Sequence, residues 1–83
     1  MVFVRIEPIG DQQPLTSEQL RGMASALGVM SGTPISMGKD GSMTLGLPDD
    51  RFLDQDTAKA SVGMVLRMQY GENWDRRFRV LDG

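Results

Sequence analysis

Two stretches of this chain alternate between mainly apolar and mainly polar positions. Residues 2–7 read Val-Phe-Val-Arg-Ile-Glu, so that one face is wholly apolar and the other carries Phe3 and Arg5, before Pro8 ends the run. Residues 76–81 alternate in the same way. A period of two residues is typical of a strand with one buried face. Both stretches therefore predict strands whose second face is left open.

Residues 33–47 predict a hairpin, because two alternating runs flank a turn-forming Lys-Asp-Gly sequence. A three-residue loop over residues 39–41, with its glycine in the left-handed region, places Met37 opposite Met43 and keeps one face apolar. A two-residue Asp-Gly loop would instead place Met37 opposite Thr44 and mix apolar with polar partners. We therefore predict the three-residue loop.

Local signals define a first helix between Thr16 and Gly28. Thr16 is a good N-cap, and Gln19 three residues later completes a capping box. Leucine and methionine then recur at helical spacing, and Gly28 is the type of residue that ends a helix.

A second helix begins at Asp54 or Asp56, either of which can cap it, and ends at Gly71. Gly63 lies inside this helix, where glycine costs about 1 kcal/mol relative to alanine. We expect it to mark close packing on the sheet. The apolar stripe of the helix consists of Ala58, Val62, Val65, Leu66 and Met68.

Seven methionines are many for 83 residues. Met30 falls in the loop after the first helix and is expected to be exposed; an exposed patch with Met64 would favour a binding role. The interpretation that we prefer is that the methionines within the predicted elements, Met64 included, fill the core, because they lie on or beside apolar stripes: Met23, Met37, Met43, Met64 and Met68.

The order of these elements is β-α-β-β-α-β, which predicts one α+β domain over residues 1–83. Right-handed crossovers arrange the strands in the order 4-1-3-2, in an antiparallel sheet with both helices on one face. This arrangement resembles the ferredoxin-like sandwich. The sheet face away from the helices is where we expect function.

The chain contains neither cysteine nor histidine. Disulfides, thiolate nucleophiles, zinc sites of the usual kind and Ser-His-Asp arrangements cannot be built from it. We therefore expect no enzyme, no cofactor and no metal site. No apolar run approaches the roughly 20 residues of a membrane span, and the N-terminus lacks the features of a signal peptide. We expect a cytoplasmic protein that does not bind membranes.

Charge is distributed unevenly: the 11 acidic residues exceed the 9 basic ones, yet three of the basic residues fall within residues 76–79. Arginine binds carboxylates and phosphates bidentately and stacks on rings, and aromatic residues anchor interfaces. We therefore expect a partner-binding surface that consists of Phe3, Arg5, Trp74, Arg76, Arg77 and Arg79.

The preferred hypothesis is a non-catalytic interaction module, of the type of a phage or mobile-element accessory protein, that binds another protein or a second copy of itself. The alternative is single-stranded nucleic-acid binding. The expected open face resembles that of RNA-recognition-motif domains, which bind RNA there, but Thr44 and Gly46 stand where those domains carry aromatic residues. A third possibility is that the arginines only solvate the face and pair with acids such as Glu7.

The segment Leu53-Asp54-Gln55-Asp56-Thr57 resembles the DxDxT motif of haloacid-dehalogenase-type phosphotransferases. That family needs the motif at the end of a buried parallel strand, whereas here it opens a predicted helix. Aspartate at a helix N-terminus is explained by capping and by the helix dipole.

Overall fold

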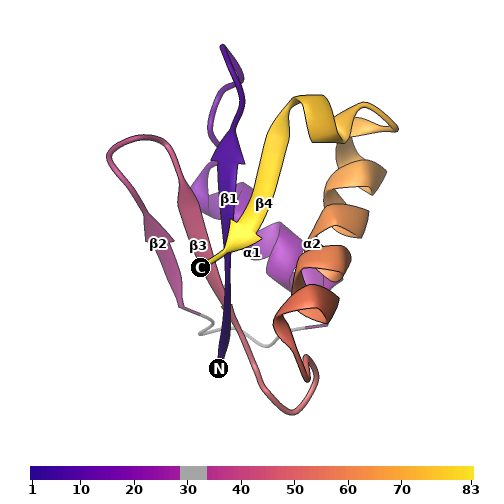
Figure 1. Ribbon diagram of the computed structural model, residues 1–83. Coiled ribbons are helices and arrows are strands. Elements are labelled where there is room, and N and C mark those ends of the chain that lie inside the picture. The colour runs from indigo at the N-terminus through magenta and orange to yellow at the C-terminus, as the bar shows by residue number, and fades with distance from the viewer. Residues whose placement is uncertain (29–33) are drawn as a thin grey trace.

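The computed structural model describes residues 1–28 and 34–83, so Met30, which we expected to be exposed, lies outside the described residues. Within those ranges the chain forms four strands, two α-helices and one short 3₁₀ helix (Figure 1). In chain order the elements are β1 (Val2–Pro8), α1 (Ser17–Ala26), β2 (Ile35–Met37), β3 (Met43–Leu47), α2 (Gln55–Tyr70), η1 (Trp74–Arg76) and β4 (Phe78–Asp82).

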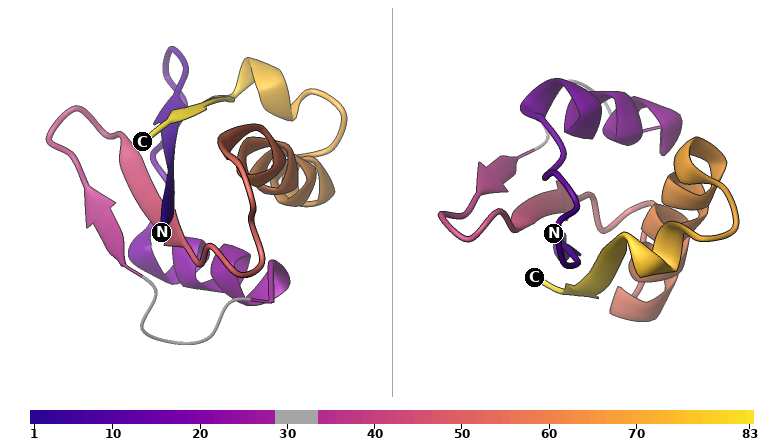
Figure 2. Two further views of the ribbon diagram at one scale, coloured as in Figure 1. Left: turned by 60° about the horizontal axis from the view of Figure 1, so that its bottom comes forward. Right: turned by 90° about the horizontal axis from the view of Figure 1, so that it is seen from above.

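The strands form an open antiparallel sheet in the order β2-β3-β1-β4, which makes this an α+β fold. β1 lies in the middle, with β3 on one side and β4 on the other, and the three-residue β2 forms one edge. Seen from above, both helices lie on the same side of the sheet (Figure 2, right).

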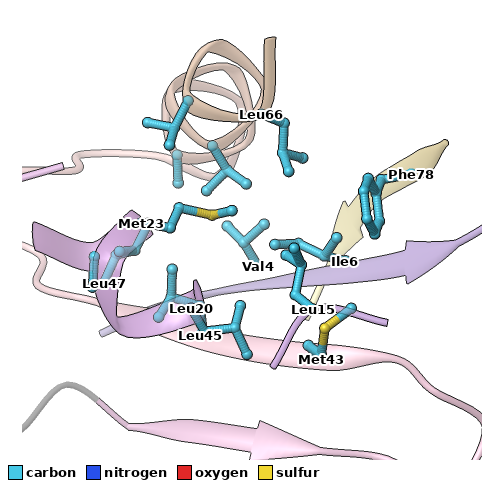
Figure 3. Packing of buried hydrophobic residues seen from close by; sticks show 14 of the residues in the cluster. Val4, Ile6, Leu15, Leu20, Met23, Met43, Leu45, Leu47, Leu66 and Phe78 are labelled. Carbon is cyan, nitrogen blue, oxygen red and sulfur yellow. The ribbon is translucent and has the colours of Figure 1, made fainter. Parts of the chain in front are cut away.

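The core lies between that side of the sheet and the helices, where α2 packs against β1 and β4 (Figure 3). Val4 and Ile6 of β1 have no exposed surface, and Leu66 of α2 is equally buried. The buried cluster draws on every strand of the sheet except β2 and on both helices: Val4, Ile6, Leu15, Leu20, Met23, Ala24, Met43, Leu45, Leu47, Phe52, Ala58, Val62, Val65, Leu66 and Phe78.

Within the described ranges, no helix is both long enough and apolar enough to cross a membrane.

The capping box predicted for α1 is present in full. The hydroxyl of Thr16 accepts a hydrogen bond of 3.1 Å from the Gln19 amide, and the Gln19 side chain accepts one of 2.9 Å from the Thr16 amide. Gly28 follows the end of the helix with a φ of +76°. Local sequence therefore fixes both ends of α1.

Asp54, rather than Asp56, is the N-cap of α2. Its carboxylate accepts a hydrogen bond of 2.7 Å from the Thr57 amide. That bond holds the pKa of Asp54 below its ordinary value, because it stabilises the charged form. Gly71 ends the helix, as predicted, with a φ of +86°.

The hairpin between β2 and β3 has the predicted three-residue loop. Met37 pairs with Met43, and Gly38 donates its amide to the Ser42 carbonyl at 2.7 Å just before the loop closes. Gly41 has a φ of +88°, a conformation that favours glycine.

The last strand begins two residues later than expected. β4 starts at Phe78, whereas Arg76 belongs to η1 and Arg77 follows it. The Arg77 amide donates to the Trp74 carbonyl at 2.9 Å, which closes a tight turn instead of a ladder bond. Alternation alone does not distinguish a strand from this turn, so the predicted range 76–81 was wrong at its start.

The prediction that the methionines fill the core holds for only part of the set. Met23 and Met43 are buried, whereas Met37, Met64 and Met68 are exposed. Met37 lies on the edge strand β2, beyond the centre of the sheet. The two methionines of α2 lie on the side of the helix that faces away from the sheet.

Candidate partner-binding surface

The face of the sheet that the helices leave uncovered is the first candidate surface. Alternation along β1 turns Val4 and Ile6 into the core and Phe3, Arg5 and Glu7 away from it. Phe3 is 42% exposed although it lies on the strand in the middle of the sheet. From the strand register, the open face consists of Phe3, Arg5, Glu7, Ser36, Thr44, Gly46, Arg79 and Leu81.

Two arginines of the open face share one carboxylate. Glu7 lies directly opposite Arg79 in the pairing of β1 with β4. Its Oε1 lies 4.0 Å from Arg79 Nη1, and its Oε2 lies 3.5 Å from Arg5 Nε. This triad of Arg5, Glu7 and Arg79 is held in place by strand pairing, since all three residues come from adjacent strands. Its net charge is +1.

The other end of the open face is apolar. Phe3 pairs with Gly46 of β3, and its ring lies over that glycine. A Cβ at Gly46 would lie 3.1 Å from Phe3 Cε1 and 2.8 Å from Met1 Sδ, closer than side chains normally pack. Gly46 thus allows Phe3 and Met1 to cover β3, which places an aromatic ring next to the charged triad.

Arg77 does not join the triad, contrary to our expectation. Its guanidinium carbon lies 5.7 Å from the centroid of the Tyr70 ring at the end of α2. Its Nη1 also donates to Gln12 Oε1 at 3.3 Å. The turn of η1 changes the direction of this side chain, which therefore contacts α2 and the loop after β1 instead of lying on the open face.

Trp74 and Arg76 lie in η1, away from the open face. Trp74 is half-buried because its indole packs against Gly63 of α2, while Arg76 is exposed. Gly63 therefore marks close packing against Trp74, not against the sheet as we expected. The six predicted site residues divide into two groups: Phe3, Arg5 and Arg79 on the open face, and Trp74, Arg76 and Arg77 around η1.

The aspartates before α2 act as local structure. Asp54 caps the helix, and Asp49 forms an ion pair with the N-terminal ammonium of Met1. Among the residues for which the structure gives positions, no three acidic side chains gather closely enough to hold a metal ion.

From the sequence, we considered an exposed patch of Met64 with Met30, but not one of Met64 with Met68. Met64 and Met68, one turn apart, lie on the outer side of α2 together with Ala60. The helical period places them opposite Val62 and Leu66, which are buried, but it does not by itself tell which of the two sides faces the core.

The arrangement of the open face suits binding: an exposed ring and two arginines lie on a rigid sheet.

Comparisons with protein families, with curated protein sequences and with solved structures found no match to this chain.

Proposed function

We propose that this chain is a non-catalytic interaction module that binds another protein through the open face. The observation that carries the proposal is the position of Phe3, which is 42% exposed and lies beside the triad on the uncovered side of the sheet. Exposed aromatic residues with arginine neighbours are enriched at protein interfaces. The rigid strand pairing also limits the conformational entropy that binding would remove.

The charge of the open face favours a protein partner over single-stranded nucleic acid. Glu7 lies between Arg5 and Arg79 and offsets part of their charge. Arg77, which we expected beside Arg5 and Arg79, contacts Tyr70 instead. Phosphate binding depends on positive charge that is free to replace counterions. A protein surface that offers carboxylates to the triad and a groove to the ring of Phe3 matches the open face better than a single-stranded nucleic acid does.

The remaining parts of the proposal concern fold family and context. The ferredoxin-like assignment is supported by the strand order, which read from the β4 edge runs β4-β1-β3-β2, and by the two helices on one side. The non-catalytic role is supported by the lack of histidine and cysteine. A cytoplasmic location agrees with the lack of cysteine. The role as a phage-type accessory protein rests on composition.

Charge reversal on the open face tests the proposal. We would compare wild-type protein, the double variant Arg5→Glu/Arg79→Glu and the control Arg21→Glu as baits in a lysate of the source cells. Arg21 is an exposed arginine of α1, outside the open face. Far-UV circular dichroism checks that all three baits are folded.

We expect a protein partner that wild type and Arg21→Glu capture and that the double variant loses, with or without nuclease. Equal capture by the double variant would show that the open face is not the binding surface. Capture that disappears with nuclease and falls steeply with salt would replace the protein partner by nucleic acid.

A further inference from the structure

The outer side of α2 is the most exposed apolar surface among the described residues. Leu53, just before the helix, is 86% exposed, Met64 66% and Met68 80%. The helical period places these methionines and Ala60 on the side opposite the buried stripe. Contiguous exposed apolar side chains on a small domain mark an interaction surface, and methionine adapts well to a partner.

Two opposite charges border this surface at its two ends. Asp56 lies in the first turn of α2 and Arg67 in the last, and both side chains are exposed. Their spacing of eleven residues is close to three helical turns, so they lie on the same flank of the helix. Their contacts within the chain are long: Asp56 lies 3.9 Å from Lys59 Nζ, and Arg67 lies 3.8 Å from Glu72. Both charges remain available for a partner.

We propose that this surface binds a second copy of the same chain, with the two α2 helices antiparallel about a twofold axis that crosses their outer sides at the height of residue 62. In that arrangement Ala60 faces the partner's Met64, so that a small side chain makes room for a large one. Asp56 faces the partner's Arg67, because both pairs are centred within one residue of Val62. A twofold interface needs such self-complementarity.

The helix macrodipoles add to the argument, because antiparallel helices place the positive N-terminus of one beside the negative C-terminus of the other. A parallel arrangement would instead leave Asp56 and the partner's Arg67 at opposite ends of the interface, where they could not pair. A membrane surface suits this helix poorly, since helices that lie on membranes carry many lysines and arginines on the polar face.

The dimer is expected to be weak. α2 has 16 residues, which corresponds to about 24 Å of helix. One pair of such helices buries less surface than a stable interface of standard size. We expect a dissociation constant of about 100 µM. The dimer leaves the open face of each copy free, because α2 lies on the covered side of the sheet.

Sedimentation velocity over a range of about 5 µM to 1 mM tests the dimer. We expect a concentration-dependent shift from monomer to dimer for wild type. The variant Met64→Glu/Met68→Glu is expected to weaken association by at least about 100-fold, since four apolar side chains leave the interface. The control Met37→Glu changes an exposed methionine of β2 and is expected to associate like wild type.

A charge exchange tests the antiparallel arrangement separately. Asp56→Arg alone and Arg67→Asp alone each place like charges opposite each other, and each is expected to weaken association by about tenfold. Mixing the two variants restores both opposite-charge contacts in a heterodimer, which we expect to form with nearly wild-type affinity. Circular dichroism confirms that each variant is folded.

Three results would overturn the proposal. Wild-type protein that stays monomeric up to about 1 mM excludes a dimer of the expected strength. A dimer that withstands the methionine substitutions does not use α2. A dimer that the mixture of charge variants fails to restore is not the antiparallel one.

Discussion

Gly63 and Trp74 form a pair whose energetic coupling can be measured. A Cβ added to Gly63 would lie 3.0 Å from Cη2 and 3.2 Å from Cζ2 of the indole, which is tighter than ordinary van der Waals contact. The same glycine lies inside α2, where it costs about 1 kcal/mol relative to alanine. The structure explains that cost as the room that the indole needs.

The two substitutions should therefore not be additive. In the wild-type background, Gly63→Ala gains helix propensity but displaces the indole, so we expect a change in the free energy of unfolding close to zero. Trp74→Ala lowers this free energy by about 2 kcal/mol, less than the 3–5 kcal/mol of a fully buried ring because Trp74 is half-buried. In the Trp74→Ala background, Gly63→Ala gains its full propensity of about 1 kcal/mol. The expected coupling energy is about 1 kcal/mol.

Urea unfolding of the four proteins, followed by far-UV circular dichroism, measures this coupling, because tryptophan fluorescence is lost in half of them. Gly22→Ala is the matched control: Gly22 lies in α1, and a Cβ there would meet nothing within 4 Å. Gly22→Ala should stabilise the wild-type protein and the Trp74→Ala variant by the same amount, about 1 kcal/mol. A coupling below about 0.3 kcal/mol between positions 63 and 74 would refute the explanation.

Two further predictions concern the N-cap of α1 and the ion pair between α2 and β4. Thr16→Ala removes the capping box of α1 and should lower the free energy of unfolding, measured in urea, by about 1 kcal/mol. Thr16→Ser keeps the hydroxyl and should stay close to wild type. An equal loss of stability in both variants would show that the Thr16 hydroxyl does not stabilise the helix. Lys59 lies 2.9 Å from Asp82, and the hydrogen bond to that carboxylate raises the pKa of Lys59 above 10.5. A lysine pKa that is higher in the folded than in the unfolded chain stabilises the fold at pH values below the unfolded pKa. This stabilisation is lost as pH rises through the folded pKa. The Tm difference between wild type and Lys59→Met should therefore stay constant up to about pH 10 and shrink above it, and a difference that never shrinks would contradict the role of this ion pair.

Features that depend on a few neighbouring residues could be predicted from the sequence. The ends of α1 follow from Thr16, Gln19 and Gly28, since each acts through a bond or a backbone angle within one turn. The hairpin register follows from the need to keep Met37 and Met43 on one face. The placement of Phe3, Arg5 and Arg79 together also follows from alternation, because side chains of neighbouring strands share a face.

Features that depend on distant contacts could not be predicted in this way. Arg77 contacts Gln12, which lies 65 residues earlier in the chain, and no local pattern predicts that contact. The exposure of Met68 depends on how α2 sits against β1 and β4, which leaves its outer side uncovered. A hydrophobic residue in a helix can be predicted to be buried only when it is known which side of the helix faces the core.

The position of Glu7 has an evolutionary consequence. The glutamate codons differ by one nucleotide from those of glutamine and of lysine. Replacing Glu7 by lysine would leave three adjacent positive charges, with Arg5 and Arg79, around an exposed Phe3. Such a surface has the composition of a single-strand binding platform. A single point mutation, with every core side chain unchanged, would therefore shift the partner that we propose for the open face from a protein to a single-stranded nucleic acid.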